Sequence, residues 1–306
     1  TRNYLAALDV NTGNATSWDP NSDSPIEKLA VHGTNIYAAG SFTNIGGQAR
    51  NRLAAIDASS GNATSWNPNP NNGVNAIAID GSTVFVGGYF TNISGQPRNK
   101  LAALDISTAA ATAWNPNPNG DVTDLVIDGA STMYVAGSFT NISGQARNGI
   151  AAININTGSA SSWNPNPNAS VDRVYDNGGT VYITGPFNIV GGQSRSWLAE
   201  IDKTTGIATT WDPRPNYEIK GIGTIGSLIY VGGSFQVIGG RMQKMLAAIN
   251  ASTGVATSWD FKLSGNDIKS VLVSGSNVFM VGDFRNANYQ VRSGFFRMDL
   301  SGNLLP

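Results

Sequence analysis

The chain of 306 residues has few side chains that could do acid–base or nucleophilic chemistry. It contains one histidine, His32, and three glutamates, Glu27, Glu200 and Glu218. A serine–histidine–aspartate triad would have to use His32, and no nucleophile elbow stands near it. His32 occupies a position where the related segment "IDGS" has Asp80, so we interpret it as a turn residue. A carboxylate pair that hydrolyses glycosidic bonds remains open, because distant loops can bring two acids together.

Metal chemistry has one weak candidate, an acidic position that recurs before a short turn. The residues at this position are Asp9, Asp57, Asp105, Asn154, Asp202, Asn250 and Asp299. Aspartate before a tight turn usually accepts hydrogen bonds from the turn itself, and "DVNTGN" is shorter than an EF-hand loop. The chain has no cysteine, which excludes thiolate metal sites and disulfides. We expect no cofactor, with calcium as the open alternative.

Composition excludes two classes of partner. The formal net charge is −1, whereas a nucleic-acid-binding protein needs a basic face that releases counterions from phosphates. No apolar run approaches the roughly 20 residues of a membrane helix. We therefore expect neither nucleic-acid binding nor membrane insertion.

The few chemical groups are carried by a repeat with a fixed period. Its tryptophans recur every 48 or 49 residues, and a phenylalanine preceded two positions earlier by glycine keeps the same step. The two aromatic series are Trp18, Trp66, Trp114, Trp163, Trp211, Trp259 and Phe42, Phe90, Phe139, Phe187, Phe235, Phe284. A period in this range is typical of a propeller or a solenoid.

Each repeat reads as four short strands, as in "VNAIAID", "VFVGGYF", "KLAALD" and "ATAWNP" between residues 74 and 116. Four strands in about 48 residues make one propeller blade. We predict an all-β fold: a single domain over residues 1–306, a six-bladed β-propeller of four-stranded antiparallel blades. The third strand occurs seven times and the tryptophan strand six times. A seven-bladed parent with an incomplete blade is therefore the alternative.

The pattern "VGG-F-TNI-GQ-RN-LAALD--TG-AT-W-P" resembles the delta-60 repeat propellers of bacterial secreted proteins over essentially the whole chain. The strand order also resembles Kelch blades. The "A-x-D-x-x-T-G" run before each tryptophan is similar to the docking motif of quinoprotein propellers. That motif has three residues between the glycine and the tryptophan, whereas four separate Gly13 from Trp18. The resemblance implies a fold and a surface location but no reaction.

The two ends of the chain predict ring closure. The sequence begins inside a repeat at a third strand, and it ends just after another third strand. Propellers protect exposed sheet edges by joining strands from both termini. We predict that residues 1–20 pair with the blade formed by residues 268–284. The surplus strand would cap that blade or pair with a neighbouring chain, which allows self-assembly.

The faithfully repeated residues are predicted to build the scaffold, and function is expected where a copy departs from the pattern. The arginine that follows "GQ", for example Arg50, is predicted to bind backbone carbonyls of the next blade. Departures gather on the long-loop face of the last repeats, and their types favour binding. The predicted ligand-binding residues are Arg214, Tyr217, Glu218, Arg241, Met242, Lys244, Lys262 and Tyr289.

A second set of variable residues starts the innermost strands and would surround the entrance of the channel. These residues are Glu27, Lys28, Asp124, Asp172, Arg173, Lys220 and Lys269. We expect a bacterial secreted or cell-surface module, without enzymatic activity, that binds a protein or a glycan in adhesion or in a surface structure. A glycan hydrolase with a site at the channel mouth is the alternative, and two close acids beside aromatic residues would favour it.

Overall fold

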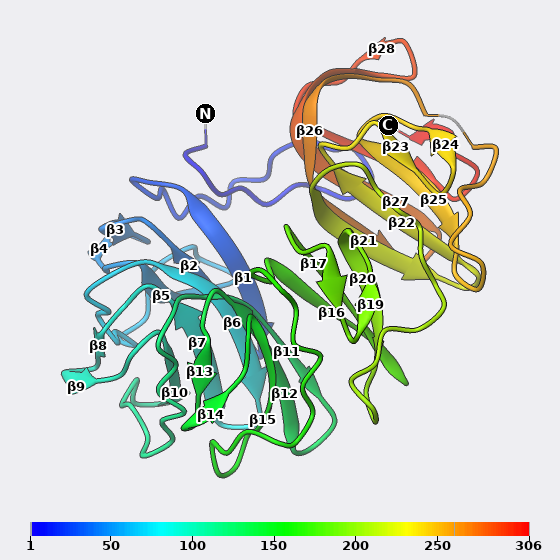
Figure 1. The fold of residues 1–306 in the computed structure, drawn as a ribbon. Coiled ribbons are helices and arrows are strands. Elements are labelled where there is room, and N and C mark those ends of the chain that lie inside the picture. Colours follow the sequence, from blue (N-terminus) through cyan, green and yellow to red (C-terminus); the bar gives the residue numbers. More distant parts are fainter. Residues whose placement is uncertain (1, 260, 306) are drawn as a thin grey trace. The chain divides into compact units, whose positions relative to one another are not determined.

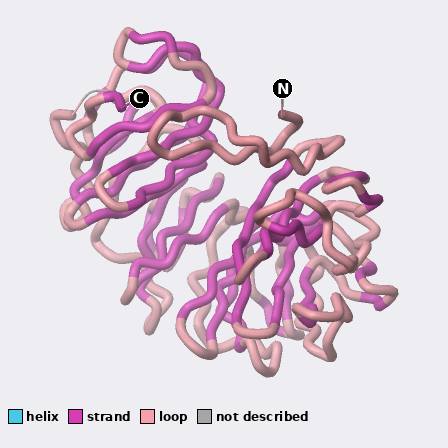
Figure 2. Tube along the Cα trace, turned by 180° about the vertical axis from the view of Figure 1, so that it is seen from behind, coloured by secondary structure: helices cyan, strands magenta, loops and turns pink. Residues whose placement is uncertain are grey.

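The computed structural model describes residues 2–259 and 261–305, and its regular structure there consists of β-strands (Figure 1). The tube view shows strands joined by loops, and no helix is assigned in the described residues (Figure 2). It follows that these residues hold no helix able to cross a membrane. The chain forms two compact units, Thr1–Asn164 and Pro165–Pro306. The all-β prediction is confirmed.

Small antiparallel sheets of one design recur along both units. In each, the central strand lies between the first and third strands of its repeat. The first unit contains β1 (Ile26–His32), β2 (Asn35–Gly40), β5 (Leu53–Asp57); β6 (Val74–Asp80), β7 (Thr83–Gly88), β10 (Leu101–Asp105); and β11 (Val122–Asp128), β12 (Thr132–Gly137), β15 (Ile150–Asn154).

The second unit repeats the same order. Its strands are β16 (Arg173–Asn177), β17 (Thr180–Gly185), β20 (Trp197–Asp202); β21 (Ile219–Ile225), β22 (Leu228–Gly233), β25 (Leu246–Asn250); and β26 (Leu263–Ser274), β27 (Asn277–Ala287), β29 (Phe295–Asp299), followed by β30 (Leu304–Leu305). Central strands such as β7 are buried at every residue after the first, which explains their run of Val, Phe and Gly.

The long loop after each central strand contains a two-residue hairpin that the sequence analysis did not predict. The hairpin strands are β3 (Asn44–Ile45) and β4 (Gln48–Ala49); β8 (Asn92–Ile93) and β9 (Gln96–Pro97); β13 (Asn141–Ile142) and β14 (Gln145–Ala146); β18 (Ile189–Val190) and β19 (Gln193–Ser194); and β23 (Val237–Ile238) and β24 (Arg241–Met242). In the last repeat β28 (Gln290–Val291) pairs with the end of β27. Gly46 and Gly47 have φ of 59° and 73°, the backbone that a tight two-residue hairpin requires.

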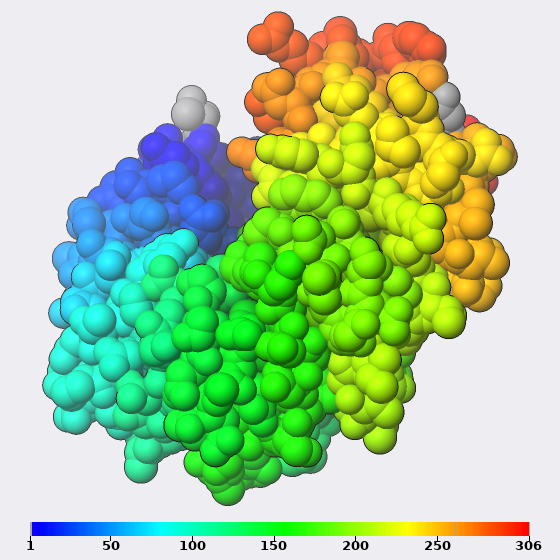
Figure 3. All heavy atoms as spheres, viewed as in Figure 1, coloured from blue at the N-terminus to red at the C-terminus, as the bar shows by residue number. Residues whose placement is uncertain are grey.

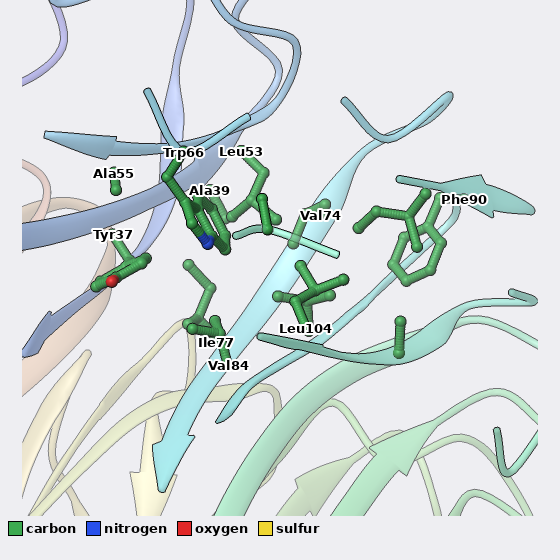
Figure 4. Packing of buried hydrophobic residues seen from close by; sticks show 14 residues of the cluster. Tyr37, Ala39, Leu53, Ala55, Trp66, Val74, Ile77, Val84, Phe90 and Leu104 are labelled. Carbon is green, nitrogen blue, oxygen red and sulfur yellow. The ribbon is translucent and has the colours of Figure 1, made fainter. Parts of the chain in front are cut away.

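Core packing joins one repeat to the next, as the tryptophan spacing predicts. Figure 4 shows Tyr37, Leu53 and Trp66 of one repeat beside Ile77 and Val84 of the following repeat. The ring of Trp66 lies edge-on to Tyr37, with centroids 5.1 Å apart, and 4% of Trp66 is exposed. The repeated aromatic residues therefore fill the space between neighbouring sheets.

The prediction of four full strands in each sheet is wrong for the tryptophan segment. This segment makes one bridge to its sheet, as between Ile56 and Ala63, instead of a strand. Two features limit it: the Thr64 hydroxyl accepts the Trp66 backbone N–H at 3.2 Å, and Pro68 has no N–H to donate. Each of the first five sheets thus has three strands and one bridged segment.

The last repeat shows the effect of losing the prolines. Leu263 occupies the position after Trp259 that Pro70 has after Trp66. Unlike proline, leucine has a backbone N–H that can donate a hydrogen bond. Strand β26 accordingly begins at Leu263, which pairs with Ala287, and β26 and β27 are 12 and 11 residues long. The outer strand of this sheet is β30, which pairs with β29.

The N-terminal segment packs on its own unit. Leu5 and Trp18 contact the cluster that includes Phe42 and Ile56, and Leu8 forms a bridge with Ala15. Thr1, Asp260 and Pro306 lie outside the described residues. Thr1 begins the predicted closing segment 1–20, and Asp260 begins the departing segment after Trp259. Ring closure between residues 1–20 and 268–284, and the number of blades in a ring, stay predictions.

Candidate functional site

The repeated arginine is a structural clamp, with a correction to the predicted partner. A terminal nitrogen of Arg50 donates to the carbonyl oxygen of Thr64 at 2.6 Å, and Arg195 donates to Thr209 and Trp211 in the same way. Both acceptors belong to the tryptophan segment of the arginine's own repeat, not to the next blade. The reason is geometric: this bridged segment offers carbonyls that no strand partner uses.

The recurring aspartate caps its turn. Oδ1 of Asp57 accepts hydrogen bonds from the backbone of Ser60 at 2.7 Å and from the hydroxyl of Ser59 at 2.6 Å. The Ser59 hydroxyl and the Ser60 backbone N–H lower the pKa of Asp57 to about 2. No group of three His, Cys, Asp or Glu side chains suited to a metal ion occurs among the described residues.

One pocket of about 340 Å³ lies in the second unit between the long loop of the fifth repeat and the segment after Trp259. Loop strands β23 and β24, in yellow, reach the visible surface of this unit (Figure 3). The pocket is lined by Gln236, Met242, Lys244, Phe261, Lys262 and Leu263. Three of these were predicted as ligand-binding residues: Met242, Lys244 and Lys262.

The apolar wall of the pocket combines a fixed and an open part. Phe261 is 4% exposed. Its ring stacks on that of Phe296, with centroids 5.1 Å apart, and lies tilted against that of Trp259, with centroids 5.4 Å apart. Met242, by contrast, is 80% exposed and extends from hairpin strand β24. A rigid aromatic floor beside a flexible thioether suits an apolar group that enters from solvent.

The lysines bring positive charge to the same pocket. Both Lys244 and Lys262 are exposed, and Lys244 makes no ion pair within the described residues. The backbone of Lys262 is fixed by Asn288, whose Oδ1 accepts the Lys262 N–H at 3.0 Å. The pocket can therefore hold an anionic group next to an apolar one.

The other predicted ligand-binding residues do not line this pocket. Nε of Arg241 donates to the carbonyl oxygen of Ala256, which fixes the side chain on its own loop. Arg214 pairs with Asp212, with Nε and Oδ2 2.7 Å apart. Tyr289 is 87% exposed.

Tyr217 forms a small aromatic surface of its own. Its ring lies 5.2 Å from that of Trp197, and half of Tyr217 is exposed. The carboxylate of the next residue, Glu218, lies 3.3 Å from Nζ of Lys220. The sequence analysis did not identify Trp197, which has a φ of 64° at the start of β20.

The predicted channel residues of the first unit form an ion pair. Nζ of Lys28 donates to Oδ1 of Asp124 at 2.8 Å, although strand β6 lies between their strands in sequence. Asp124 is 2% exposed, so its carboxylate is buried with this partner. Glu27, which precedes Lys28 on β1, is exposed.

The channel residues of the second unit form another ion pair. Nζ of Lys220 donates to Oδ2 of Asp267 at 2.7 Å. Burial lowers the pKa of Lys220, but this bond and the charge of Glu218 raise it above its ordinary value. Burial raises the pKa of Asp267, but the hydrogen bond from Lys220 and that from the Asp283 N–H lower it below its ordinary value. Lys269 is exposed. Asp267 was missed because nothing in its sequence context distinguishes it from a turn residue.

Asp172 is a partly buried acid with a raised pKa. Burial and then the charge of Glu218 raise the pKa of Asp172, and Arg173 opposes the shift. Glu218, the acid that acts on Asp172, follows Tyr217 directly in the sequence.

Glu200, in contrast, belongs to a closed polar network. Its two carboxylate oxygens accept hydrogen bonds from the hydroxyls of Thr180 and Thr209, at 2.8 and 2.7 Å. Burial, followed by the charge of Glu200, raises the pKa of Tyr182. The network uses both carboxylate oxygens and therefore stabilises β17 and β20.

Sequence reasoning missed half of the pocket. Gln236, Phe261 and Leu263 all depart from the residues of the first three repeats, Thr, Pro and Pro. A comparison of every loop position among the copies would have found them.

Comparisons with known proteins agree with this fold. Residues 1–239 match the model of the PQQ_2 family, which is described as "Outer membrane protein assembly factor BamB". No curated protein matches the sequence.

Solved structures give a likeness of fold alone. A computationally designed protein aligns with 97% of this chain and 87% of its own, at a TM-score of 0.59 and 12% identity. The extracellular domain of a putative hybrid two component system from B. thetaiotaomicron aligns over 92% of this chain, at a TM-score of 0.58 and 14% identity. Only 33% of that chain is covered, so this protein spans about a third of its length.

Proposed function

The chain belongs to the PQQ_2 family of β-propeller-type repeats, and from that premise we propose that it is a binding module at a bacterial surface, without enzymatic activity. The matched family is described by an outer membrane assembly factor, and one structural relative is an extracellular domain. Both motivate a location outside the cytoplasm. The proposed ring has six blades, of the delta-60 type, closed by strands from both termini.

One observation carries the proposal: the residues that line the pocket are departures from an otherwise faithful repeat. The scaffold around the pocket is kept, since Gly239 and Gly240 retain the positive φ of the first hairpin. Gln243 replaces the repeated arginine yet still donates to the carbonyl oxygen of Thr257, at 3.1 Å. Pocket residues that vary while the backbone of the hairpin is retained are typical of a binding surface formed by loops.

The proposed partner is a protein, and a glycan is the other ligand that the sequence predicts. A protein partner is favoured by the exposed methionine and the aromatic floor, which suit a side chain better than a sugar ring with many hydroxyls. Strand donation between chains remains a proposal for self-assembly, and calcium remains a proposal for a cofactor.

A loop exchange tests the binding proposal. Residues 241–245, "RMQKM", are replaced by "QARNR" of the first loop, and a control exchanges residues 48–52 for "QPRNK" of the second loop. Proteins retained from a surface extract are identified and then purified for a direct binding measurement. We expect the first exchange alone to abolish binding. Equal binding by both variants would refute the assignment of this loop.

A second candidate function is a glycan hydrolase, favoured by the raised pKa of Asp172, which burial and then the charge of Glu218 produce. Here Asp172 would be the general acid and Glu218 the second carboxylate, with Tyr217 and Trp197 against the sugar. Fluorogenic glycosides test it directly. Turnover that is lost in Asp172→Asn and Glu218→Gln would establish the enzyme, and no turnover with any glycoside would leave the binding module alone.

A further inference from the structure

We propose that the pocket between β24 and the segment after Trp259 recognises a stretch of the partner protein in which acidic residues flank an apolar one. This inference rests on the proposed function and specifies the chemistry of its partner. Two observations support the inference. Two asparagines that join the loops in other repeats are both lysine here, and the remaining residues of the pocket wall supply apolar contact.

In the first repeats, two asparagines join the loops that correspond to the pocket. Nδ2 of Asn51 donates to Oδ1 of Asn69 at 2.7 Å, and Asn99 donates to Asn117 at the same distance. Residue Asn3 makes the equivalent bond to Asn21 at 2.8 Å. An asparagine pair closes this position because each side chain offers both a donor and an acceptor.

Both partners of this pair are lysine in the fifth repeat. Lys244 occupies the position of Asn51, and Lys262 occupies the position of Asn69. Ammonium groups have donors only, so the two lysines cannot form this bond with each other. The replacement therefore removes a stabilising link and places two lysines on the wall of one pocket. Lys244, which makes no ion pair among the described residues, can pair with a negative charge on a ligand.

The remaining wall residues supply apolar contact where the first repeat is small or rigid. Met242 stands at the position of Ala49, Phe261 at that of Pro68, and Leu263 at that of Pro70. Gln236, at the position of Thr43, adds an amide that can donate to or accept from a peptide group. The six changes thus convert a closed loop contact into a pocket.

The size of the pocket selects the kind of ligand. Its volume of about 340 Å³ lies at the low end of the range for ligand pockets, roughly 300–1,000 Å³. Such a space accepts an apolar side chain together with neighbouring peptide backbone, and carboxylates beside it can reach the exposed lysine side chains. The chain as a whole has a net charge of −1, so this positive rim is a local feature.

Three labelled peptides test the inference by fluorescence anisotropy with the full chain. The probes are Gly-Ser-Asp-Leu-Asp-Ser-Gly, its charge-reversed form with Lys-Leu-Lys, and a form with Asp-Ser-Asp that lacks the apolar residue. We expect saturable binding of the first probe with a Kd of about 1 mM or lower. Its affinity should exceed that of the other two probes tenfold or more and should fall at high salt.

Variants connect this binding to the pocket. Lys244→Asn combined with Lys262→Asn restores the asparagine pair of the sibling repeats and should reduce binding tenfold or more. Lys269→Asn removes an exposed lysine elsewhere on the same unit and should leave binding unchanged. An equal loss in both variants would show charge attraction without a site and would overturn the inference.

The outcomes separate this inference from the proposed function. If the acidic probe does not bind, or binds no better than the charge-reversed probe, the proposed ligand chemistry is wrong. The loop exchange then still decides whether the surface binds a protein at all. If the exchange leaves partner binding intact while the probe binds the pocket, the pocket is specific but does not serve that partner.

Discussion

The indole nitrogen of Trp66 lies 3.1 Å from the backbone carbonyl oxygen of Asp105, the residue that ends the third strand of the next repeat. Trp114 makes the same bond to Asn154, at 3.2 Å, and Trp211 to Asn250, at 3.3 Å. The acceptor is a main-chain atom, so the link does not depend on whether aspartate or asparagine stands there. Trp66, Trp114 and Trp211 thus each fasten their repeat to the following one.

Loss of one such tryptophan should be costly. Trp114 is 8% exposed and lies edge-on to Phe85, so Trp114→Ala is expected to destabilise the fold by about 3–5 kcal/mol. Trp114→Phe keeps a ring but loses the hydrogen bond, and it should cost less. Denaturant unfolding monitored by circular dichroism measures both. Unchanged stability of the alanine variant would contradict the assigned packing.

The turn aspartates should titrate far below their usual range. The Ser59 hydroxyl lowers the pKa of Asp57 to about 2, and the Ser107 hydroxyl lowers that of Asp105 to about 2, from 3.8. A lowered pKa contributes stability that is present above pH 3.8 and is lost as the pH falls towards 2. Carboxyl carbon shifts in a pH titration measure these values directly.

A matched pair of variants isolates the role of the charge. Asp57→Asn keeps the acceptor oxygen, as Asn154 does when it accepts the Thr157 N–H at 2.9 Å, and should retain the turn. Asp57→Ala removes the acceptor and should lower the melting temperature at every pH. An ordinary pKa for Asp57 would contradict the turn geometry.

Asp172 should respond to pH in the opposite direction. Its raised pKa means that its contribution to stability is present at low pH and is lost as the pH rises through the folded-state value. Asp172→Asn cannot ionise, so it should be more stable than the wild type at neutral pH and comparable in acid. The measurement is the melting temperature of both proteins at intervals of about one pH unit, from roughly pH 3 to pH 8. A wild-type advantage at neutral pH would show that the carboxylate is well paired.

The buried ion pair of the first unit should be sensitive to the loss of one partner. Lys28→Ala leaves the carboxylate of Asp124, which is 2% exposed, without its 2.8 Å contact, at a cost of about 1.5–3 kcal/mol. The second repeat has Ala76 at the position of both residues. The double variant with Asp124→Ala should therefore recover stability relative to Lys28→Ala. Additive losses in the double variant would contradict this coupling.

The repeat could be predicted from the sequence because its signals are local. The alternation of "VNAIAID" and the fixed spacing of Trp66 and Trp114 predict strands and core without knowledge of contacts between distant residues. The weak point was Thr64, since its hydroxyl competes for a backbone N–H and reduces an expected strand to one bridge. Strand propensity does not include such competition.

The site could be predicted only in part, for a different reason. Lys244 and Lys262 are conspicuous because their charge departs from the asparagines of the other copies. Phe261 replaces a proline of the other copies, but an aromatic residue in a loop does not by itself indicate a binding site, and only the structure places it on the pocket wall. The ion pairs of Asp124 and Asp267 needed coordinates, because their partners come from other strands.

The link from tryptophan to a main-chain carbonyl has a consequence for how this protein can change. Neighbouring repeats are held through atoms that every residue possesses, while the residues at the six pocket positions are not used by that link. Mutational drift or a designed library at the exposed positions among them, Met242, Lys244 and Lys262, leaves these hydrogen bonds between repeats untouched. A single gene segment, once duplicated, could thus acquire a new specificity in one copy while its siblings continue to carry the fold.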